Sequence, residues 1–178
     1  MAKATLTIIF ICLCALPATA QEYSDHNSFI LKYHRLARGV IILLNIEGEW
    51  RHYMIKNQLN IVATAYSSEA SQTDADPCYP AAWRPNRNSA PFNLCEANRE
   101  DVIAVNGLPF WSKVLINCGN GWKLYTVVDR MNARYPNLRR VDFWKRNRRA
   151  AVNFGTQRCE MILLQRVRLR HRTLIAQQ

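Results

Sequence analysis

Two aspartates in the second half of the chain have the residue type and setting that acid–base chemistry needs. Asp129 ends an apolar run, and Asp142 stands beside Phe143 and Trp144. Aromatic neighbours at a strand end can desolvate a carboxyl group and raise its pKa toward the working range of a general acid. Glycoside cleavage requires such an acid, because the departing sugar oxygen must be protonated. Asp129 and Asp142 are therefore candidate catalytic residues.

A structural role is the alternative for both aspartates. Each carboxylate could cap a turn or pair with a nearby arginine, of which the sequence offers Arg130, Arg134, Arg139 and Arg140. Aromatic faces that could stack on sugar rings are supplied by Tyr66, Phe110, Trp111 and Trp144. In a small β domain, however, aromatic residues more often belong to the core.

The elements that must position these residues are short strands. From residue 61 onward, β-branched and aromatic runs separated by turn residues predict a compact, mainly β domain. The predicted strands are 61–66, 102–105, 113–117, 122–128 and 159–164, the last open to extension through residue 167. Gly119-Asn120-Gly121 predicts a hairpin turn, because glycine and asparagine accept positive φ. One short helix is expected between Asn147 as its N-cap and Gly155 at its end.

Four cysteines are expected in the mature chain, and they predict two disulfides. None of the four has the short C-x-x-C spacing of a zinc site, so no metal site is expected. Three pairings are possible. We favour Cys78 with Cys95, which bracket part of a long polar loop over 67–98, and Cys118 with Cys159, which lie at the ends of strand-like runs.

The two ends of the chain predict export and flanking segments. Residues 1–20 combine Lys3, an apolar run over 6–16 and a final Ala18-Thr19-Ala20, the pattern of a cleaved signal peptide. The apolar run is too short to cross a bilayer, so no transmembrane span is expected in the mature chain. Residues 21–60 form an N-terminal extension whose short apolar runs suit a helix or a strand equally. Residues 166–178 form a basic tail, either an edge strand or a frayed end.

The charge balance is strongly basic. The chain of 178 residues has 24 Lys and Arg against 13 Asp and Glu, a net charge of +11. Such a surface favours polyanions, which outside the cytoplasm include wall carboxylates, wall or lipopolysaccharide phosphates and extracellular DNA. The alternative is that the charge only keeps the protein soluble. The length allows one ordinary domain with extensions.

Five segments, in order, resemble the signature blocks of the 3D domain. They are Thr64-Ala65-Tyr66-Ser67-Ser68, residues 103–114 (IAVNGLPFWSKV), Val127-Val128-Asp129-Arg130-Met131-Asn132, Arg140-Val141-Asp142-Phe143-Trp144 and Ala151-Val152-Asn153-Phe154-Gly155. That family is named for three aspartates and is related to the catalytic barrel of MltA-type lytic transglycosylases. The resemblance covers about residues 61–164, and a domain over 61–165 is expected.

The resemblance implies a six-stranded double-psi β-barrel, as in RlpA-like, expansin and barwin domains. It implies a peptidoglycan substrate, no cofactor, Asp142 as an acid that then becomes a base, and Asp129 as its supporting carboxylate. The muramyl 6-hydroxyl would be the nucleophile, so the product would be a 1,6-anhydro sugar. The substrate-binding residues expected with it are Tyr66, Asn106, Trp111, Asn132 and Trp144.

The sequence also departs from the family pattern. Asn106 stands where the family often has its first aspartate, and Arg130-Met131-Asn132 replaces a Thr-Gly-Gly that would let a glycan approach closely. The segment with Cys78 and Cys95 has no counterpart in that pattern and could either cover the cleft or lie apart from it. Two alternatives to an enzyme follow: a non-catalytic module that binds cell-wall glycans, and a basic secreted protein that acts on the polysaccharides of a host or competitor.

Overall fold

The computed structural model describes residues 21–24, 30–36, 39–46, 48–71, 73, 76–82 and 92–168. The predicted signal peptide and residues 169–178 of the basic tail lie outside these ranges. Within them no helix has the length and apolarity that crossing a bilayer requires.

The chain is mainly β, as predicted, with strands far outnumbering helical turns. In chain order the elements are β1 (Gln21–Ser24), β2 (Ile30–Leu36), β3 (Gly39–Ile46), β4 (Glu49–Ser67), α1 (Leu94–Ala97), β5 (Val102–Ala104), β6 (Lys113–Asn117), β7 (Trp122–Asp129), β8 (Arg140–Lys145), α2 (Arg148–Phe154) and β9 (Gln157–Val167).

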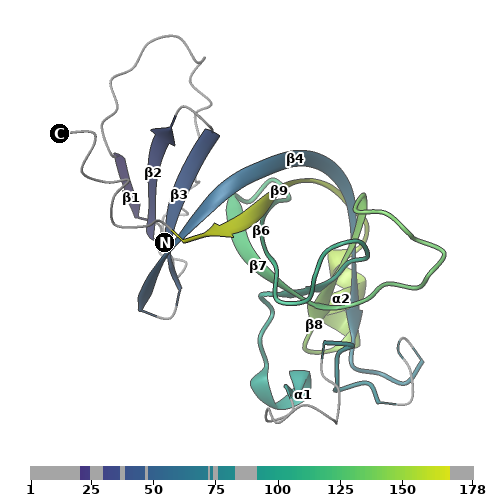
Figure 1. Cartoon of the computed structure of the whole chain (residues 1–178). Helices are drawn as coiled ribbons and strands as arrows, with labels where there is room; N and C mark the ends of the chain where they lie inside the picture. Colours follow the sequence, from purple (N-terminus) through teal and green to yellow (C-terminus); the bar gives the residue numbers. More distant parts are fainter. Residues whose placement is uncertain are drawn as a thin grey trace, which may run out of the picture. The chain divides into compact units, whose positions relative to one another are not determined.

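The strands form one sheet that closes on itself. Its order is β1-β2-β3-β4-β8-β5-β7-β6-β9, and β9 also pairs with β4, so the sheet forms a ring through six strands (Figure 1). The pairs β4–β8 and β5–β7 are parallel, whereas β5–β8 and β6–β7 are antiparallel. A closed ring leaves none of its six strands as a free edge.

The chain divides into two compact units, the first of residues 1–57 and 163–178 and the second of residues 58–162. In the first unit β1, β2, β3 and the start of β4 pair antiparallel in sequence order. Ile41, Ile42 and Leu44 of β3 are almost completely buried. The sequence left this extension as helix or strand, and the structure forms strands.

In the second unit the predicted strands are confirmed, with small changes at their ends. The Gly119-Asn120-Gly121 turn joins β6 to β7, with Asn117 opposite Trp122. The expected helix is α2, where the Asn147 side chain accepts a hydrogen bond from the Ala150 amide at 2.9 Å. The strand predicted from residue 61 is the end of the longer β4, and the predicted loop over 67–98 also contains the short helix α1.

Both expected disulfides are present. Cys78 bonds to Cys95 and Cys118 bonds to Cys159. The first ties down the long segment between β4 and β5, and the second joins the β6–β7 turn to β9. Disulfides of this kind are typical of proteins that mature in an oxidising compartment.

Candidate active site

The sheet register brings Asp129 and Asp142 to one place. Ala104, at the end of β5, is the register partner of Asp129 on β7 and of Asp142 on β8. Residues that pair across strands project from the same face, and two strand spacings separate their Cα atoms by roughly 9–10 Å. Two carboxyl groups that are distant along the backbone therefore lie on one face of the sheet, on either side of a small side chain.

An irregularity in β7 aims Asp129 at this face. Val127 pairs with Ile103, but the next residue of β5, Ala104, pairs with Asp129, so the register shifts by one residue. Extra residues of this type bend a strand and redirect side chains, and they are frequent beside active sites. The Val105 amide then donates to the Asp129 carbonyl at 3.2 Å and holds the strand end in place.

The Asp129 carboxylate accepts three hydrogen bonds. Its Oδ2 accepts from the Tyr66 hydroxyl at 2.9 Å, and its Oδ1 accepts from the backbone amides of Ala81 at 3.0 Å and Arg130 at 2.8 Å. The contacts come from β4, the segment after it and the loop that follows β7. The Asp129 carboxylate thus links three parts of the chain and is held in one position.

Asp142 has a different environment. It lies in the middle of β8, opposite Thr64 of β4, and not at a strand end as the sequence suggested. Burial raises the pKa of Asp142, and the charge of Asp129 adds to the rise, while a hydrogen bond from the Thr64 side chain and the charge of Arg140 act in the opposite direction. The net direction is upward, toward the protonated form that a general acid requires.

One oxygen of Asp142 is left without a partner. Its Oδ1 is buried, and no group in the described part of the chain hydrogen-bonds to it. Buried polar atoms are paired in the great majority of cases, so an unpaired one is a reason to look for a functional role. A carboxyl with a raised pKa and an unused oxygen is equipped to hold or pass a proton.

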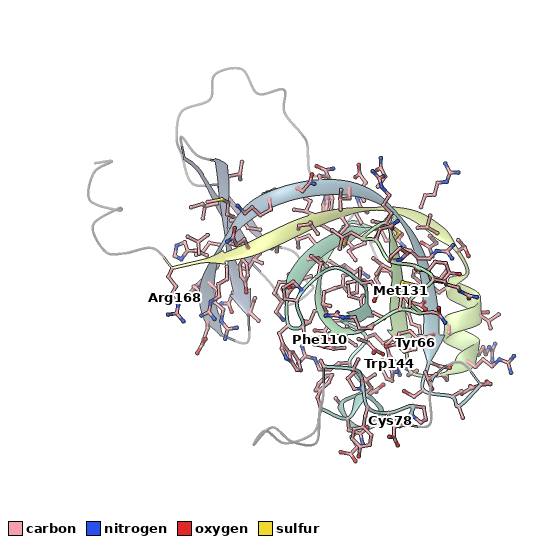
Figure 2. All side chains as sticks on the ribbon, turned by 45° about the vertical axis from the view of Figure 1, so that its right-hand side comes forward. Tyr66, Cys78, Phe110, Met131, Trp144 and Arg168 are labelled. Carbon is pink, nitrogen blue, oxygen red and sulfur yellow. A yellow bond between two sulfur atoms is a disulfide. The ribbon has the colours of Figure 1, made fainter. Side chains whose placement is uncertain are left out.

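Tyr66 and Trp144 lie beneath this site and not at its surface. Tyr66 is 7% exposed and Trp144 is 1% exposed, and both belong to a buried cluster with Ala104 and Val128. Figure 2 places Tyr66, Trp144 and Met131 close together, and Met131 packs against the same cluster. Tyr66 and Trp144 were expected to bind substrate, and their burial makes both side chains part of the core. Burial and the Asp129 charge raise the pKa of Tyr66 well above its usual value, so its hydroxyl stays a hydrogen-bond donor.

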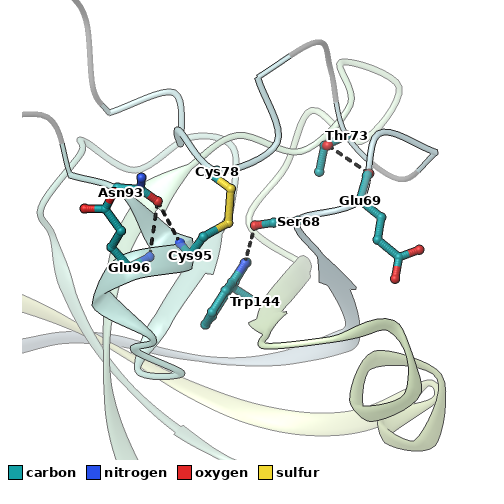
Figure 3. Close-up of a disulfide and its surroundings, with 8 residues drawn as sticks. All are labelled: Ser68, Glu69, Thr73, Cys78, Asn93, Cys95, Glu96 and Trp144. Atoms are coloured by element: carbon teal, nitrogen blue, oxygen red, sulfur yellow. Dashed lines mark hydrogen bonds between the residues drawn. A yellow bond between two sulfur atoms is a disulfide. The ribbon is translucent and has the colours of Figure 1, made fainter.

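The segment between β4 and β5 covers part of this face. Its residues Leu94, Phe92 and Ala82 pack on the buried cluster, and the Ala82 amide donates to the Val128 carbonyl at 2.8 Å. Three contacts stabilise this segment. They are the Cys78–Cys95 disulfide, the hydrogen bond from the Leu94 amide to the Cys78 carbonyl, and the Asn93 N-cap of α1 (Figure 3).

The indole of Trp144 also bonds to this segment, because its Nε1 donates to the Ser68 hydroxyl oxygen at 2.9 Å (Figure 3). The sequence left open whether the segment covers the site or lies apart from it. Its contacts place it over Asp129.

Asn106 braces the backbone of the β7–β8 loop. Its side-chain amide lies within hydrogen-bond distance of three carbonyls, those of Met131 at 3.0 Å, Asn132 at 3.4 Å and Tyr135 at 2.9 Å. An aspartate here could not donate to these carbonyls, which gives a structural reason for asparagine. Asn106 was expected to bind substrate, but its amide is used within the protein.

Asn132 and Arg130 also hydrogen-bond to backbone atoms of the loops that follow β7 and β5. The Asn132 side chain accepts from the Arg134 amide at 3.0 Å, and this turn is exposed. Arg130 donates to the carbonyls of Val105 at 3.0 Å and Leu108 at 2.8 Å, and its guanidinium lies 3.6 Å from the centre of the Phe110 ring. The loops after β5 and β7 are therefore fastened to each other.

Trp111 is the predicted aromatic residue that stays open to solvent. It is 52% exposed, contacts Phe92 edge-on at 5.9 Å between ring centres, and has a φ of 68°. A bulky residue rarely adopts positive φ, so this conformation is a strain that the surrounding contacts must impose. One such contact is the hydrogen bond from the Trp111 amide to the Val127 carbonyl at 2.7 Å.

Thr64 and Ala81 were not predicted to belong to the site. Thr64 follows the strand alternation, but its place opposite Asp142 depends on a parallel pairing between distant segments. Ala81 acts through its backbone amide, for which a sequence has no signal. In the part of the chain that the structure describes, no group of three or more His, Cys, Asp or Glu side chains is arranged to hold a metal ion.

Comparisons with known proteins do not assign the chain. No protein-family profile matches it, and no curated protein matches it either. Its function is therefore argued from the site.

Proposed function

We propose that this protein is a secreted, peptidoglycan-cleaving enzyme of the lytic transglycosylase type, with Asp142 as its acid and base. The observation that carries the proposal is the Asp142 carboxyl, which combines a raised pKa with a buried oxygen that has no hydrogen-bond partner in the described chain. The register around Ala104, which sets the Asp129 charge beside it, supports the same role.

In the proposed reaction one carboxyl group serves both steps. Protonated Asp142 gives its proton to the oxygen that links N-acetylmuramic acid to the next sugar, and the bond from this oxygen to the muramyl C1 breaks. The Asp142 carboxylate then takes the proton of the muramyl 6-hydroxyl, whose oxygen bonds to C1. The products are a 1,6-anhydro sugar and a shortened glycan, with Asp142 protonated again.

Asp129 has a supporting role in this scheme. Its charge is fixed by three hydrogen bonds and raises the pKa of Asp142. A fixed negative charge also favours the positive charge that develops at C1 as the bond breaks. Trp111 is the proposed platform for a sugar ring, because it is exposed and adjoins Phe92.

For the fold and location we propose a six-stranded double-psi β-barrel of the 3D-domain type, released by cleavage after residue 20. The six-strand ring with its two parallel pairings supports the barrel. The signal-like N-terminus and the two disulfides support export.

The deciding experiment incubates oxidised protein with purified peptidoglycan sacculi and analyses the released fragments by mass spectrometry. Wild type should release 1,6-anhydro muropeptides, and Asp142→Asn should release none. Asp101→Asn is the matched control, since Asp101 is paired with Arg99 and should leave the products unchanged. Absence of soluble fragments from wild type at every pH tried would refute the enzymatic proposal.

A non-catalytic module that binds wall glycans is the second candidate. Two observations favour it. The segment between β4 and β5 hydrogen-bonds to Asp129, and the Asn106 amide donates to backbone carbonyls, so neither side chain is fully available to a substrate. In that case sacculi would sediment the protein without releasing fragments, and Asp142→Asn would bind as well as wild type.

A further inference from the structure

The loop between β7 and β8 gathers positive charge that the proposed reaction does not use. Between Asp129 and Asp142 the sequence has no acidic residue and four arginines, Arg130, Arg134, Arg139 and Arg140. Arg130 is occupied by backbone carbonyls and Phe110. Arg134 is exposed and Arg140 is half-buried, so both can meet a ligand.

The Tyr135 ring contacts both of these guanidinium groups. The Arg134 guanidinium lies 4.9 Å and the Arg140 guanidinium 4.6 Å from the centre of the Tyr135 ring. Cation–π contacts orient both groups but do not neutralise them. In the described residues neither arginine has a carboxylate within ion-pair distance, so the pair is a local concentration of positive charge.

The backbone that carries the pair is held in place before any ligand binds. The Asn106 amide donates to the Tyr135 carbonyl at 2.9 Å, and the Asn132 side chain accepts from the Arg134 amide. Gly107 approaches Leu138 so closely that an added Cβ would lie 3.1 Å from its Cδ2. A pre-organised loop loses little conformational entropy on binding, which favours affinity.

The pair is also next to the candidate acid. Arg140 precedes Asp142 by two residues on β8, so their side chains leave the same face and their Cα atoms are about 7 Å apart. The charge of Arg140 acts on Asp142 directly. An anionic group that is bound by Arg134 and Arg140 would therefore bring the rest of its molecule to Asp142.

We propose that Arg134 and Arg140 form an anion subsite for a carboxylate or phosphate group carried by the saccharide that reaches Asp142. Guanidinium groups bind both oxyanions with paired, charge-assisted hydrogen bonds. The inference deepens the proposed function and rests on it for the identity of the saccharide. In a wall glycan the carboxylates belong to the peptide substituents and the phosphates to attached polymers.

The test measures sedimentation of the oxidised full chain with sacculi at fixed ionic strength. Arg134→Gln with Arg140→Gln should lower the affinity at least about tenfold, the loss of roughly one charge-assisted hydrogen bond. Arg148→Gln with Arg149→Gln is the matched control, because it removes the same charge from exposed positions of α2 and should lower the affinity much less. Lysine at 134 and 140 should recover only part of the loss, since it keeps the charge without the planar fork.

Two treatments of the sacculi identify the anion. The loop variant is Arg134→Gln with Arg140→Gln. If hydrofluoric acid, which strips phosphate polymers, removes the difference in affinity between the loop variant and wild type, the ligand is a phosphate. If amidation of the peptide carboxyls removes it, the ligand is a carboxylate. Equal losses in the loop and α2 variants, or a difference that survives both treatments, would overturn the subsite.

The subsite and the proposed reaction can fail separately. A loop variant that loses affinity while wild type releases no anhydro products would leave the subsite standing and refute the enzyme. A loop variant that binds like the α2 control while Asp142→Asn abolishes product would refute the subsite alone. Arg134→Gln by itself, at an exposed turn, is the fallback variant if the double substitution does not fold.

Discussion

At the residue scale, the two aspartates differ in what surrounds their oxygens. Asp129 accepts hydrogen bonds from Tyr66, Ala81 and Arg130, whereas the Oδ1 of Asp142 has no partner in the described residues. Burial raises the pKa of Asp142, and the Thr64 hydrogen bond offsets this only in part. The two carboxyl groups therefore have different surroundings, and the proposed division of acid and supporting roles is argued from that difference.

Asp142→Asn should make the protein more stable at neutral pH. The pKa of Asp142 is raised in the fold, so its contribution to stability is fully present in acid and is lost as pH rises through the raised pKa. Asparagine does not ionise and avoids this loss. A gain of about 1 kcal/mol would raise Tm by roughly 2–4 °C at this chain length.

Thermal unfolding across acid to neutral pH measures this effect, and the gain should vanish in acid. Glu100→Gln is the opposing control. The partners Lys145 and Arg146 leave the pKa of Glu100 lowered despite its partial burial, so its contribution is present at neutral pH and is lost as pH falls. A Tm for Asp142→Asn at or below wild type at neutral pH would contradict the burial cost described for Asp142.

Thr64→Val should move the titration of Asp142 to higher pH. The Thr64 side chain hydrogen-bonds to the carboxyl and lowers its pKa, so removal of the hydroxyl raises that pKa further. The alkaline limb of the pH–rate profile should shift upward, because the protonated acid persists to higher pH. Carbon NMR of the carboxyl measures the same shift without turnover, and Thr64→Ser should restore the wild-type value.

At the element scale, the short strand β5 organises the site. It has only three residues, yet it pairs with β7 on one side and β8 on the other, so Ala104 faces both aspartates. The segment between β4 and β5 completes the arrangement by donating the Ala81 amide to Asp129. Strand pairing sets the distance between the carboxyls, and the segment fixes one of them.

Removal of the Cys78–Cys95 disulfide should loosen the site more than it lowers global stability. Because its cysteines are separated by 17 positions, its loss costs roughly 3 kcal/mol in the chain-entropy model, against roughly 4 kcal/mol for Cys118–Cys159 with a separation of 41. Hydrogen exchange should show lost protection at the Ala81 and Ala82 amides in Cys78→Ser with Cys95→Ser. In Cys118→Ser with Cys159→Ser, hydrogen exchange should rise across the whole sheet. If the Ala81 amide of Cys78→Ser with Cys95→Ser stays as protected as in wild type, the proposed local effect of the Cys78–Cys95 disulfide is refuted.

Most strands and α2 were predictable from the sequence, because their signals are local. β6 and β7 are β-branched runs on either side of a glycine turn, and Asn147 caps α2 as its position predicted. The extension before residue 60 could not be assigned, since short apolar runs suit both helix and strand. α1 was missed because four residues with one buried side chain carry little pattern.

At the scale of the whole molecule, the net charge of +11 should make binding to sacculi sensitive to salt. Raising NaCl from about 50 mM to about 500 mM shortens the range of electrostatic attraction several-fold, so the affinity should fall by about tenfold or more. Sedimentation at each salt concentration measures this, and a neutral chitin oligomer, followed by calorimetry, should show little change. Salt-independent binding to sacculi would mean that the basic surface does not contact the wall.

The sequence by itself determined the basic charge, predicted the mainly β class and singled out Asp129 and Asp142 as candidates, because these depend on residue type and local order. It favoured the disulfide pairs that the structure contains but left three pairings possible. Only the tertiary structure decided which aspartate has a buried oxygen without a hydrogen-bond partner in the described residues. That depends on Thr64, Ala81 and Ala104, which reach the carboxyls through pairings and loop contacts between segments far apart in the chain. It also decided that Trp144 is core and Trp111 is surface, since burial is a property of the packed sheet and not of the tryptophan.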